Sequence, residues 1–367
     1  MLYHSQCYVM MCRLLKRYNL NYHTVSGGGE VVPGHTVTMS SFAGTILSVD
    51  DFLTVSTGLV TTETTLYIYN NSLYQLLDPT SQLLEPVRVM AANRLARTGA
   101  EWTEMMARHN GGTYNNQWMV VDYNKLGKDG SLAAGALWVY EQLPGQTWAE
   151  DQTEELRRSG YWVSYNRAFY PEVFKISGGE NMTSIHGDYF SYRDTPRAKI
   201  MRREQARVVS EETMINFMRF NDFQNDPAAR VEGCNNPIPA GSVANRCDLT
   251  LPGSVCEWEE LDEMVGHQGY GALDMKFTTS KLLRAGQQFW AVAGPTHNER
   301  MPPFSWINTN LTDFPLYSPI KTFDFTPQVH AWSLPSVGGG VAVQLSLQLL
   351  LLTTLLSLLA GSVLQLN

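Results

Sequence analysis

The stretch "NGGTYNNQWMVVDY" (residues 110–123) decides how the middle of the chain folds. Its two glycines allow a tight turn, and the apolar run that follows is typical of a buried strand. Three carboxamides, Asn115, Asn116 and Gln117, stand between the turn and that strand. The stretch therefore predicts a helix end, a turn and a strand, with polar side chains gathered where the strand begins.

Similar patterns place the other elements. Runs rich in β-branched and aromatic residues predict strands at 36–42, 45–49, 52–60, 64–69, 117–123, 135–143, 161–166 and 272–280. Apolar spacing and capping signals predict helices at 5–18, 86–96, 100–110 and 210–220. Ser210 is expected to cap the last of these helices, and residues 221–253 are expected to be loop-like. Strands in a run, then helices, then strands again indicate an α+β fold.

Composition narrows the class of function. The chain has 367 residues, is 44% hydrophobic and carries a net charge of −8, so no nucleic-acid partner is expected. Its one basic cluster, residues 197–207, is interpreted as a solvated helix face. Neither the cysteines nor the histidines show the spacing of a metal site, and no phosphate-binding loop occurs, so no metal and no cofactor are expected.

Glycosylation sequons fit a secreted glycoprotein, and disulfides form in the secretory compartment. Cys234, Cys247 and Cys256 lie close together in sequence, and two of them are expected to pair, although spacing leaves the choice open. The chain contains three N-x-S/T sequons, which are predicted to be glycosylated: Asn70, Asn181 and Asn310.

The C-terminal segment is distinct from the rest. No charged residue follows Asp324, and the chain from Val341 is apolar enough and long enough to span a bilayer. The small residues of 333–340 favour a signal for a glycosylphosphatidylinositol (GPI) anchor, with a membrane anchor as the alternative. We therefore divide the chain into a domain at 1–332 and a hydrophobic tail at 333–367. The N-terminus lacks the signal peptide that such a tail requires, which indicates that an N-terminal part is missing.

Standard catalytic motifs do not occur, so the candidate site rests on polar residues embedded in aromatic segments. Thr65, Asn115, Asn116, Asn166 and Arg197 are of this kind. Carboxamide and guanidinium groups can stabilise an oxyanion because they present N–H groups without changing protonation. The alternative is that these side chains satisfy the backbone of turns.

Several of these stretches resemble one known family. "SSFAGTILSVDDFLTVSTGLVTTETT", "ANRLARTGAEW", "GTYNNQWMVVDY", "YWVSYN", "GDYFSYRDTPRA", "MRFNDFQNDP", "NRCDLTLP" and "AGPTHNERMPPFSW" are similar, in this order, to the phospholipase B-like family. The resemblance covers about 8–332. It implies an N-terminal-nucleophile (Ntn) hydrolase with an αββα sandwich, which matures by self-cleavage and uses a new N-terminal cysteine as nucleophile and base. It also implies a lysosomal or secreted glycoprotein that removes acyl chains from phospholipids or related esters and amides.

The resemblance assigns roles by position. Asn166 is implied as the oxyanion donor, while Arg197 and Thr65 hold the nucleophile or polar groups of the substrate. Supporting roles around the site are assigned to Asn115, Asn116, Arg246 and Asp248. For Asn115 and Asn116 the expected role is hydrogen bonding to backbone.

The implied nucleophile has no counterpart in the chain. Cys7 and Cys12 are interior residues of a predicted helix and have no free α-amino group. We therefore expect a truncated sequence that is inactive and poorly folded alone, whose partners would be an acyl-lipid substrate, the N-terminal fragment of its precursor and a membrane. The alternative is a non-catalytic, membrane-anchored surface glycoprotein that keeps the fold for binding.

Overall fold

A computed structural model describes residues 2–7, 14–42, 44–48, 51–251, 253–258, 265–309, 311 and 320–332. The chain divides into one compact unit at 1–330 and a second at 331–367. The predicted tail at 333–367 and the sequon residue Asn310 lie outside the described residues. Within the described part, no helix has both the length and the apolar character needed to cross a membrane.

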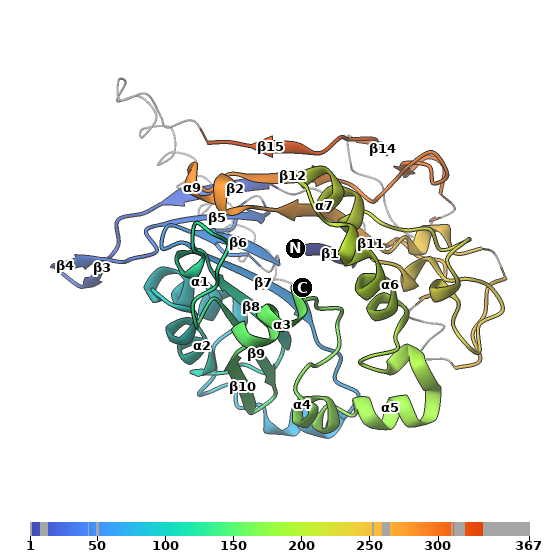
Figure 1. Cartoon of the computed structure of the whole chain (residues 1–367). Helices are drawn as coiled ribbons and strands as arrows, with labels where there is room; N and C mark the ends of the chain where they lie inside the picture. Colours follow the sequence, from blue (N-terminus) through green and yellow to red (C-terminus); the bar gives the residue numbers. More distant parts are fainter. Residues whose placement is uncertain are drawn as a thin grey trace, which may run out of the picture. The chain divides into compact units, whose positions relative to one another are not determined.

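The main element of the first unit is a seven-stranded antiparallel sheet with the order β10-β9-β8-β7-β6-β5-β2 (Figure 1). Its strands are β2 (Leu14–Asn19), β5 (Thr36–Ser41), β6 (Phe52–Val55), β7 (Leu59–Thr65), β8 (Asn116–Asp122), β9 (Leu137–Leu143) and β10 (Gln146–Asp151). Strands that follow one another along the chain are neighbours through most of this sheet, so antiparallel connections between successive strands account for its order.

A second antiparallel sheet has the order β1-β11-β12-β15. Its strands are β1 (Leu2–Cys7), β11 (Tyr270–Phe277), β12 (Phe289–Ala293) and β15 (Gln328–His330). Two short pairs complete the strands: β3 (His23–Val25) with β4 (Gly28–Val31), and β13 (Phe304–Ser305) with β14 (Thr322–Phe323).

The described part of the chain contains eight α-helices, five of which lie in the sequence between β10 and β11. They are α1 (Glu85–Leu95), α2 (Gly99–Ala107), α3 (Thr153–Ser159), α4 (Pro171–Ile176), α5 (Gly179–His186), α6 (Pro196–Glu204), α7 (Glu211–Met218) and α9 (Ser280–Arg284). Residues 221–251 contain only short 3₁₀ turns, as their composition predicted. The remaining 3₁₀ turns are Asn71–Leu76, Tyr123–Lys125, Gly187–Phe190 and Gln205–Arg207.

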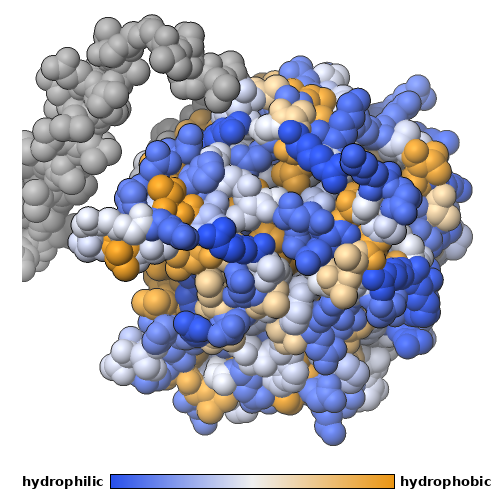
Figure 2. Space-filling model, turned by 60° about the vertical axis from the view of Figure 1, so that its left-hand side comes forward, coloured by the Kyte–Doolittle hydropathy of each residue, from blue (hydrophilic) through white to orange (hydrophobic). Residues whose placement is uncertain are grey.

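Each sheet packs against its own pair of helices (Figure 1). Trp102 and Met106 of α2 pack with Trp118 and Tyr140 of the seven-stranded sheet in one core cluster. A second cluster joins residues of α6 and α7 to the four-stranded sheet, with Phe217 as one of its members. Hydrophilic residues cover most of the face drawn in Figure 2, and its apolar residues lie in separate small groups.

The two sheets also contact each other. The rings of Phe52 on β6 and Phe289 on β12 are 5.5 Å apart between centroids. The buried ammonium of Lys276 on β11 lies 2.9 Å from Asp274 and 3.3 Å from Asp51, which precedes β6. A buried charge persists only when it is paired in this way, so the two sheets share both an apolar and an ionic contact.

The predicted α+β class is confirmed, as are the strands at 36–41 and 117–122 and the helices beginning near Pro86 and after Ser210. Ser210 caps its helix through a reciprocal capping box with Thr213. The pairing left open by the sequence is Cys234 with Cys256, while Cys247 is free and buried.

Five local predictions are wrong. The run predicted as one strand at 52–60 is instead β6, a turn and the start of β7, and the strand predicted at 64–69 ends at Thr65, because two short strands that pair with each other replace one long one. The segment predicted as a helix at 5–18 contains the strands β1 and β2 instead, because each finds a full antiparallel partner, which outweighs local helical spacing. Residues 8–13 lie outside the described part. The segments 45–48 and 161–166 are irregular and belong to neither sheet, because an apolar run forms a strand only where a partner strand is available.

Candidate functional site

Thr65, Asn166 and Arg197, the three residues to which the sequence assigned catalytic roles, lie side by side. Asn166 Nδ2 donates to the backbone oxygen of Thr65 at 2.8 Å. Arg197 Nη1 donates to Asn166 Oδ1 at 2.6 Å. Thr65 ends β7, Asn166 lies in the irregular segment before α4, and Arg197 is in the first turn of α6. Tertiary packing therefore brings three separate elements together at one carboxamide.

The backbone of Asn166 is left-handed, with φ of 65°. Few residues other than glycine adopt this region, and asparagine is the commonest of them. Arg167 Nη1 donates to the backbone oxygen of Asn166 at 3.1 Å, and the Tyr165 hydroxyl donates to the backbone oxygen of Tyr192 at 2.7 Å. These contacts hold the segment on both sides of Asn166, so the orientation of its carboxamide is set by neighbouring residues.

A cavity of about 40 Å³ lies beside these residues, and both Asn166 and Arg197 line it. Its other walls come from Tyr67, Tyr165, Arg167, Tyr189, Thr195, Ala240, Gly241, Asn245 and Tyr270. A space of this size holds one or two water molecules. The Thr65 side chain does not line it; Thr65 contributes through its backbone oxygen.

Arg167 is a prominent member of this wall that the sequence analysis did not single out. Its guanidinium lies 5.6 Å from the ring centroid of Tyr67 and 5.7 Å from those of Tyr189 and Phe190. Its Nη2 donates to the Tyr189 oxygen at 3.0 Å. Guanidinium groups stack on aromatic faces in this manner. The only sequence signal for this role was the position next to Asn166.

A buried carboxylate anchors the segment that carries Asn166. Glu141 of β9 accepts hydrogen bonds from the backbone N–H of Phe169 at 2.6 Å and of Tyr170 at 3.3 Å. Gln117 Nε2 donates to the same carboxylate at 2.5 Å. Burial raises the pKa of Glu141 to about 7, and the three hydrogen bonds oppose that shift. Gln117 of β8 therefore donates a hydrogen bond to a buried acid, whereas Asn115 lies directly before β8 begins.

The remaining carboxamides of "YNNQW" have two different partners. Asn115 Nδ2 donates to the backbone oxygen of Gly112 at 2.8 Å, as expected. Asn116 Nδ2 instead lies 2.8 Å from both carboxylate oxygens of Glu85, and Trp118 Nε1 donates to Glu85 at 2.7 Å. Burial raises the pKa of Glu85 to about 7. The backbone contact predicted for Asn116 is wrong, because a buried carboxylate of α1 needs its N–H donors.

Tyr114 connects Thr65 to a third buried acid. Its hydroxyl donates to Glu63 Oε1 at 3.2 Å. Burial raises the pKa of Tyr114 well above its usual range, Glu63 raises it further, and a hydrogen bond with Thr65 opposes the shift. Tyr114 therefore remains an uncharged hydrogen-bonding group at physiological pH.

Arg246 and Asp248 form a buried ion pair, with Arg246 Nε 2.8 Å from Oδ1 and Nη2 2.7 Å from Oδ2. Arg246 Nη1 also donates to the backbone oxygens of Thr296 and Pro302. Neither residue lines the cavity beside Asn166, although the adjacent Asn245 does. The pair ties the segment at 246–248 to the loop at 296–302.

The two described sequons differ in accessibility. Asn181 is exposed on α5. Asn70 is partly buried, and its Nδ2 donates to the Ile176 oxygen at 3.2 Å while its Oδ1 accepts from Ser72. Of the two, Asn181 has the more accessible amide.

Among the cysteines with described side chains, none suits a nucleophile. Cys234 and Cys256 are joined in a disulfide. Burial raises the pKa of the Cys247 thiol to about 12, with a further contribution from Asp248. Within the described residues, no group of three His, Cys, Asp or Glu side chains is arranged to hold a metal ion.

Comparisons with known proteins give a consistent result. A family model described as phospholipase B matches residues 3–330. A Homo sapiens protein named "Putative phospholipase B-like 2" is 37% identical over 329 residues, covering 89% of this chain and 55% of the relative. Phospholipase B-like protein B of Dictyostelium discoideum is 36% identical over 321 residues, covering 87% of this chain and 52% of the relative. The chain thus spans about half the length of the curated relatives it matches.

Proposed function

The chain belongs to the phospholipase B family, and we propose that it forms the oxyanion-binding side of a hydrolase that removes acyl chains from phospholipids. Related lipid esters and amides fall in the same proposed substrate class. Its bond chemistry would be the hydrolysis of a carboxylic ester or amide.

One observation carries this proposal: the hydrogen-bonded series from Arg197 through Asn166 to Thr65. Because Arg197 can only donate, its bond identifies the Asn166 atom that it contacts as the carboxamide oxygen. The Nδ2 atom carries two N–H groups, and the Thr65 oxygen takes one of them. The second is a preorganised donor beside the cavity, which is the arrangement that stabilises a developing oxyanion.

The proposed reaction is acyl transfer through a cysteine with a free α-amino group. The thiol sulfur attacks the acyl carbonyl while the amino group takes the thiol proton, and the carbonyl oxygen becomes an oxyanion beside Asn166. Collapse of this intermediate breaks the ester bond, and the amino group returns the proton to the departing alcohol. Water then releases the acyl group by the same steps. In this proposal the nucleophile lies outside the described residues.

The order of layers supports an Ntn-type sandwich. Helices α1 and α2 pack on the seven-stranded sheet, that sheet contacts the four-stranded sheet, and α6 and α7 pack on the latter. The disulfide and the exposed Asn181 support a lysosomal, secreted or cell-surface location with glycosylation. A membrane attachment through the tail at 333–367 belongs to the same proposal.

A second candidate is a non-catalytic surface glycoprotein of the same fold. The observation that favours it is the size of the cavity beside Asn166, about 40 Å³, which is far below the volume of typical ligand pockets. In this reading the three polar residues maintain the fold around that cavity, and no acyl group is processed.

The decisive experiment uses protein secreted from the complete native transcript and measures fatty-acid release from phospholipid vesicles. Asn166→Ala is expected to lower kcat by about 10²–10³-fold, the usual effect of losing an oxyanion donor. The matched control is Asn225→Ala, because Asn225 is exposed. Equal rates for Asn166→Ala and the wild type would refute the proposed role. Vesicle binding without fatty-acid release in any of the proteins would favour the binding protein.

A further inference from the structure

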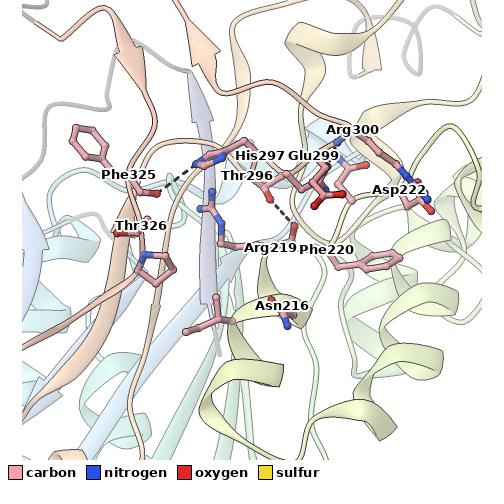
Figure 3. A pocket seen from close by; sticks show the side chains of 14 residues that line it. Asn216, Arg219, Phe220, Asp222, Thr296, His297, Glu299, Arg300, Phe325 and Thr326 are labelled. Atoms are coloured by element: carbon pink, nitrogen blue, oxygen red, sulfur yellow. Dashed lines mark hydrogen bonds and ion pairs between the residues drawn. The ribbon is translucent and has the colours of Figure 1, made fainter.

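A second cavity, of about 610 Å³, lies away from Asn166 and shares no lining residue with the small cavity described above. Three segments form it: residues 215–222 at the end of α7, residues 296–300, and residues 325–327 (Figure 3). Two of them belong to the stretches "MRFNDFQNDP" and "AGPTHNERMPPFSW", for which the proposed function has no role. Its volume falls in the range of small-molecule sites.

Arg219 is a partly buried charged group in this cavity, which Asp222, Glu299 and Arg300 also line. Its Nη1 and Nη2 donate to the backbone oxygens of Gly294 at 3.3 Å and Pro295 at 3.1 Å. No described carboxylate forms an ion pair with it. Burial lowers the pKa of Arg219 to about 10, and the nearby Arg246 contributes, so the group stays positive at neutral pH. Backbone oxygens satisfy its hydrogen bonds but leave its charge without a counter-ion.

Three acidic side chains lie at or near the edge of the cavity, and one of them, Asp222, is paired with an arginine. Asp222 lies 3.5 Å from Arg300, and Asp324 lies 3.7 Å from His297 Nε2. Glu299 is exposed. Burial and the charge of Arg219 lower the pKa of His297, which leaves its imidazole uncharged at neutral pH. Figure 3 shows the guanidinium of Arg219 pointing toward the His297 ring.

The other walls combine uncharged polar side chains, such as Asn216 and Thr326, with apolar ones. Ile215 and Phe220 contribute from the α7 side, and Phe325 and Pro327 from the facing segment. Phe325 is 41% exposed, although a large aromatic ring gains most from burial. A ligand that fills this cavity would therefore meet apolar side chains, uncharged polar groups and the positive charge of Arg219, with Glu299 at the exposed edge.

We propose that this cavity binds an anionic amphiphile, with a carboxylate or phosphate head against Arg219 and a single apolar chain along Ile215, Phe220 and Phe325. A guanidinium matches either oxyanion head, and the apolar walls exclude a head group without a chain as the preferred ligand. The inference goes beyond the proposed hydrolase, because it concerns a different cavity and does not require turnover.

The test is a calorimetric titration of the purified protein with five probes: decanoate, decyl phosphate, decanol, decyltrimethylammonium and inorganic phosphate. Decanoate or decyl phosphate is expected to bind at least 10-fold more tightly than decanol, and the cation is expected not to bind. The preferred anion identifies the source of the head group, a free fatty acid or a phosphate ester. Binding of decanol with the affinity of the anions would overturn the proposal, as would binding of inorganic phosphate with the affinity of decyl phosphate.

Variants locate the binding. Arg219→Met is expected to weaken anion binding at least 10-fold, with Lys281→Met, an exposed lysine of α9, as the control. Phe325→Asp places a negative charge at an exposed position and should weaken binding similarly even if Arg219→Met folds poorly, whereas Phe325→Leu should retain it. Unchanged affinity in Phe325→Asp would refute the site. Asn166→Ala should bind the probes normally, so failure of the hydrolase proposal and failure of this one are distinguishable.

Discussion

Arg197 Nη1 donates to Asn166 Oδ1 at 2.6 Å, across 31 residues of sequence. This bond orients the carboxamide so that its nitrogen meets the Thr65 oxygen and keeps one N–H available. A lysine at 197 would reach the same oxygen only through a flexible chain with a point charge. The relationship between these two side chains is therefore the one on which the proposed chemistry depends.

The first prediction concerns that bond. Arg197→Met is expected to lower kcat about 10- to 100-fold with little change in KM, because the Asn166 amide loses its orientation. Arg197→Lys should restore part of the rate, and Arg108→Met, at an exposed arginine directly after α2, is the control. A double-mutant cycle with Asn166→Ala should show strong non-additivity in kcat. Additive losses would mean that Arg197 does not act through Asn166.

The second prediction concerns pH. Glu85 is 3% exposed, and its pKa rises from an ordinary value near 4.5 to about 7. Between these values the folded state binds the proton and the unfolded state does not. Protonation of Glu85 thus makes its full contribution to the free energy of unfolding below pH 4.5, and this contribution is lost as the pH rises through about 7. The loss is up to about 3 kcal/mol.

Glu85→Gln should remove this dependence, since an uncharged amide replaces the acid and can donate to Asn116 Oδ1, which has no partner among the described residues. Urea unfolding at pH 5 and pH 8 measures the effect. The free energy of unfolding of the variant, relative to that of the wild type, should therefore be higher at pH 8 than at pH 5. Glu104→Gln, at a side chain that is 71% exposed, should behave as the wild type. A constant stability difference at both pH values would contradict the prediction.

The third prediction concerns the disulfide between Cys234 and Cys256, which are separated by 22 residues. Closing a loop of this length stabilises a folded chain by about 3 kcal/mol in the loop-entropy treatment. The double variant Cys234→Ser/Cys256→Ser should lose about that much, measured by urea unfolding. Adding a reductant should destabilise the wild type and leave the double variant unchanged. Equal sensitivity of both proteins to the reductant would contradict this assignment.

The fourth prediction concerns a close approach of backbone at Gly34. A Cβ atom there would meet the backbone oxygen of Asn93 and the Cα of Arg94 in α1. Gly34 also exchanges hydrogen bonds of 2.9 Å with Arg94. Gly34→Ala should therefore cost about 1–3 kcal/mol of unfolding free energy. Gly127→Ala, whose neighbours are the movable side-chain ends of Ser131 and Asp129, should cost much less in the same measurement.

The fifth prediction concerns glycosylation. Protein made through the secretory route should carry a glycan on Asn181, because this residue is exposed on α5. Asn181→Gln should remove the corresponding mass, as measured on the intact protein. Asn70→Gln should instead lower stability, since the Asn70 amide bonds the Ile176 oxygen and caps a 3₁₀ turn. An unmodified Asn181 in the secreted protein would contradict the predicted glycosylation of this residue.

Local chemistry accounts for what could be predicted in the fold. The capping box at Ser210 and the helix start near Pro86 depend on residues within one turn of each other, so their signals are complete in the sequence. The strand of "QWMVVD" was predictable for the same reason, since its apolar run is continuous. The strand predicted at 161–166 is wrong for a different reason. "YWVSYN" has strand composition, but the segment has no partner strand, and Glu141 holds the residues after it instead.

By itself, the sequence determined the α+β class, the strands at 36–41 and 116–122 and the helices at 85–95, 99–107 and 211–218. Through its resemblance to a family it also predicted Thr65, Asn166 and Arg197 as site residues. It could not determine that Asn116 would serve Glu85, that Cys247 would stay unpaired, or that Arg219 would face a cavity without a counter-ion. These depend on residues tens to hundreds of positions apart becoming neighbours. Burial and charge pairing act only after the chain has packed, and for this reason the tertiary structure alone decided them.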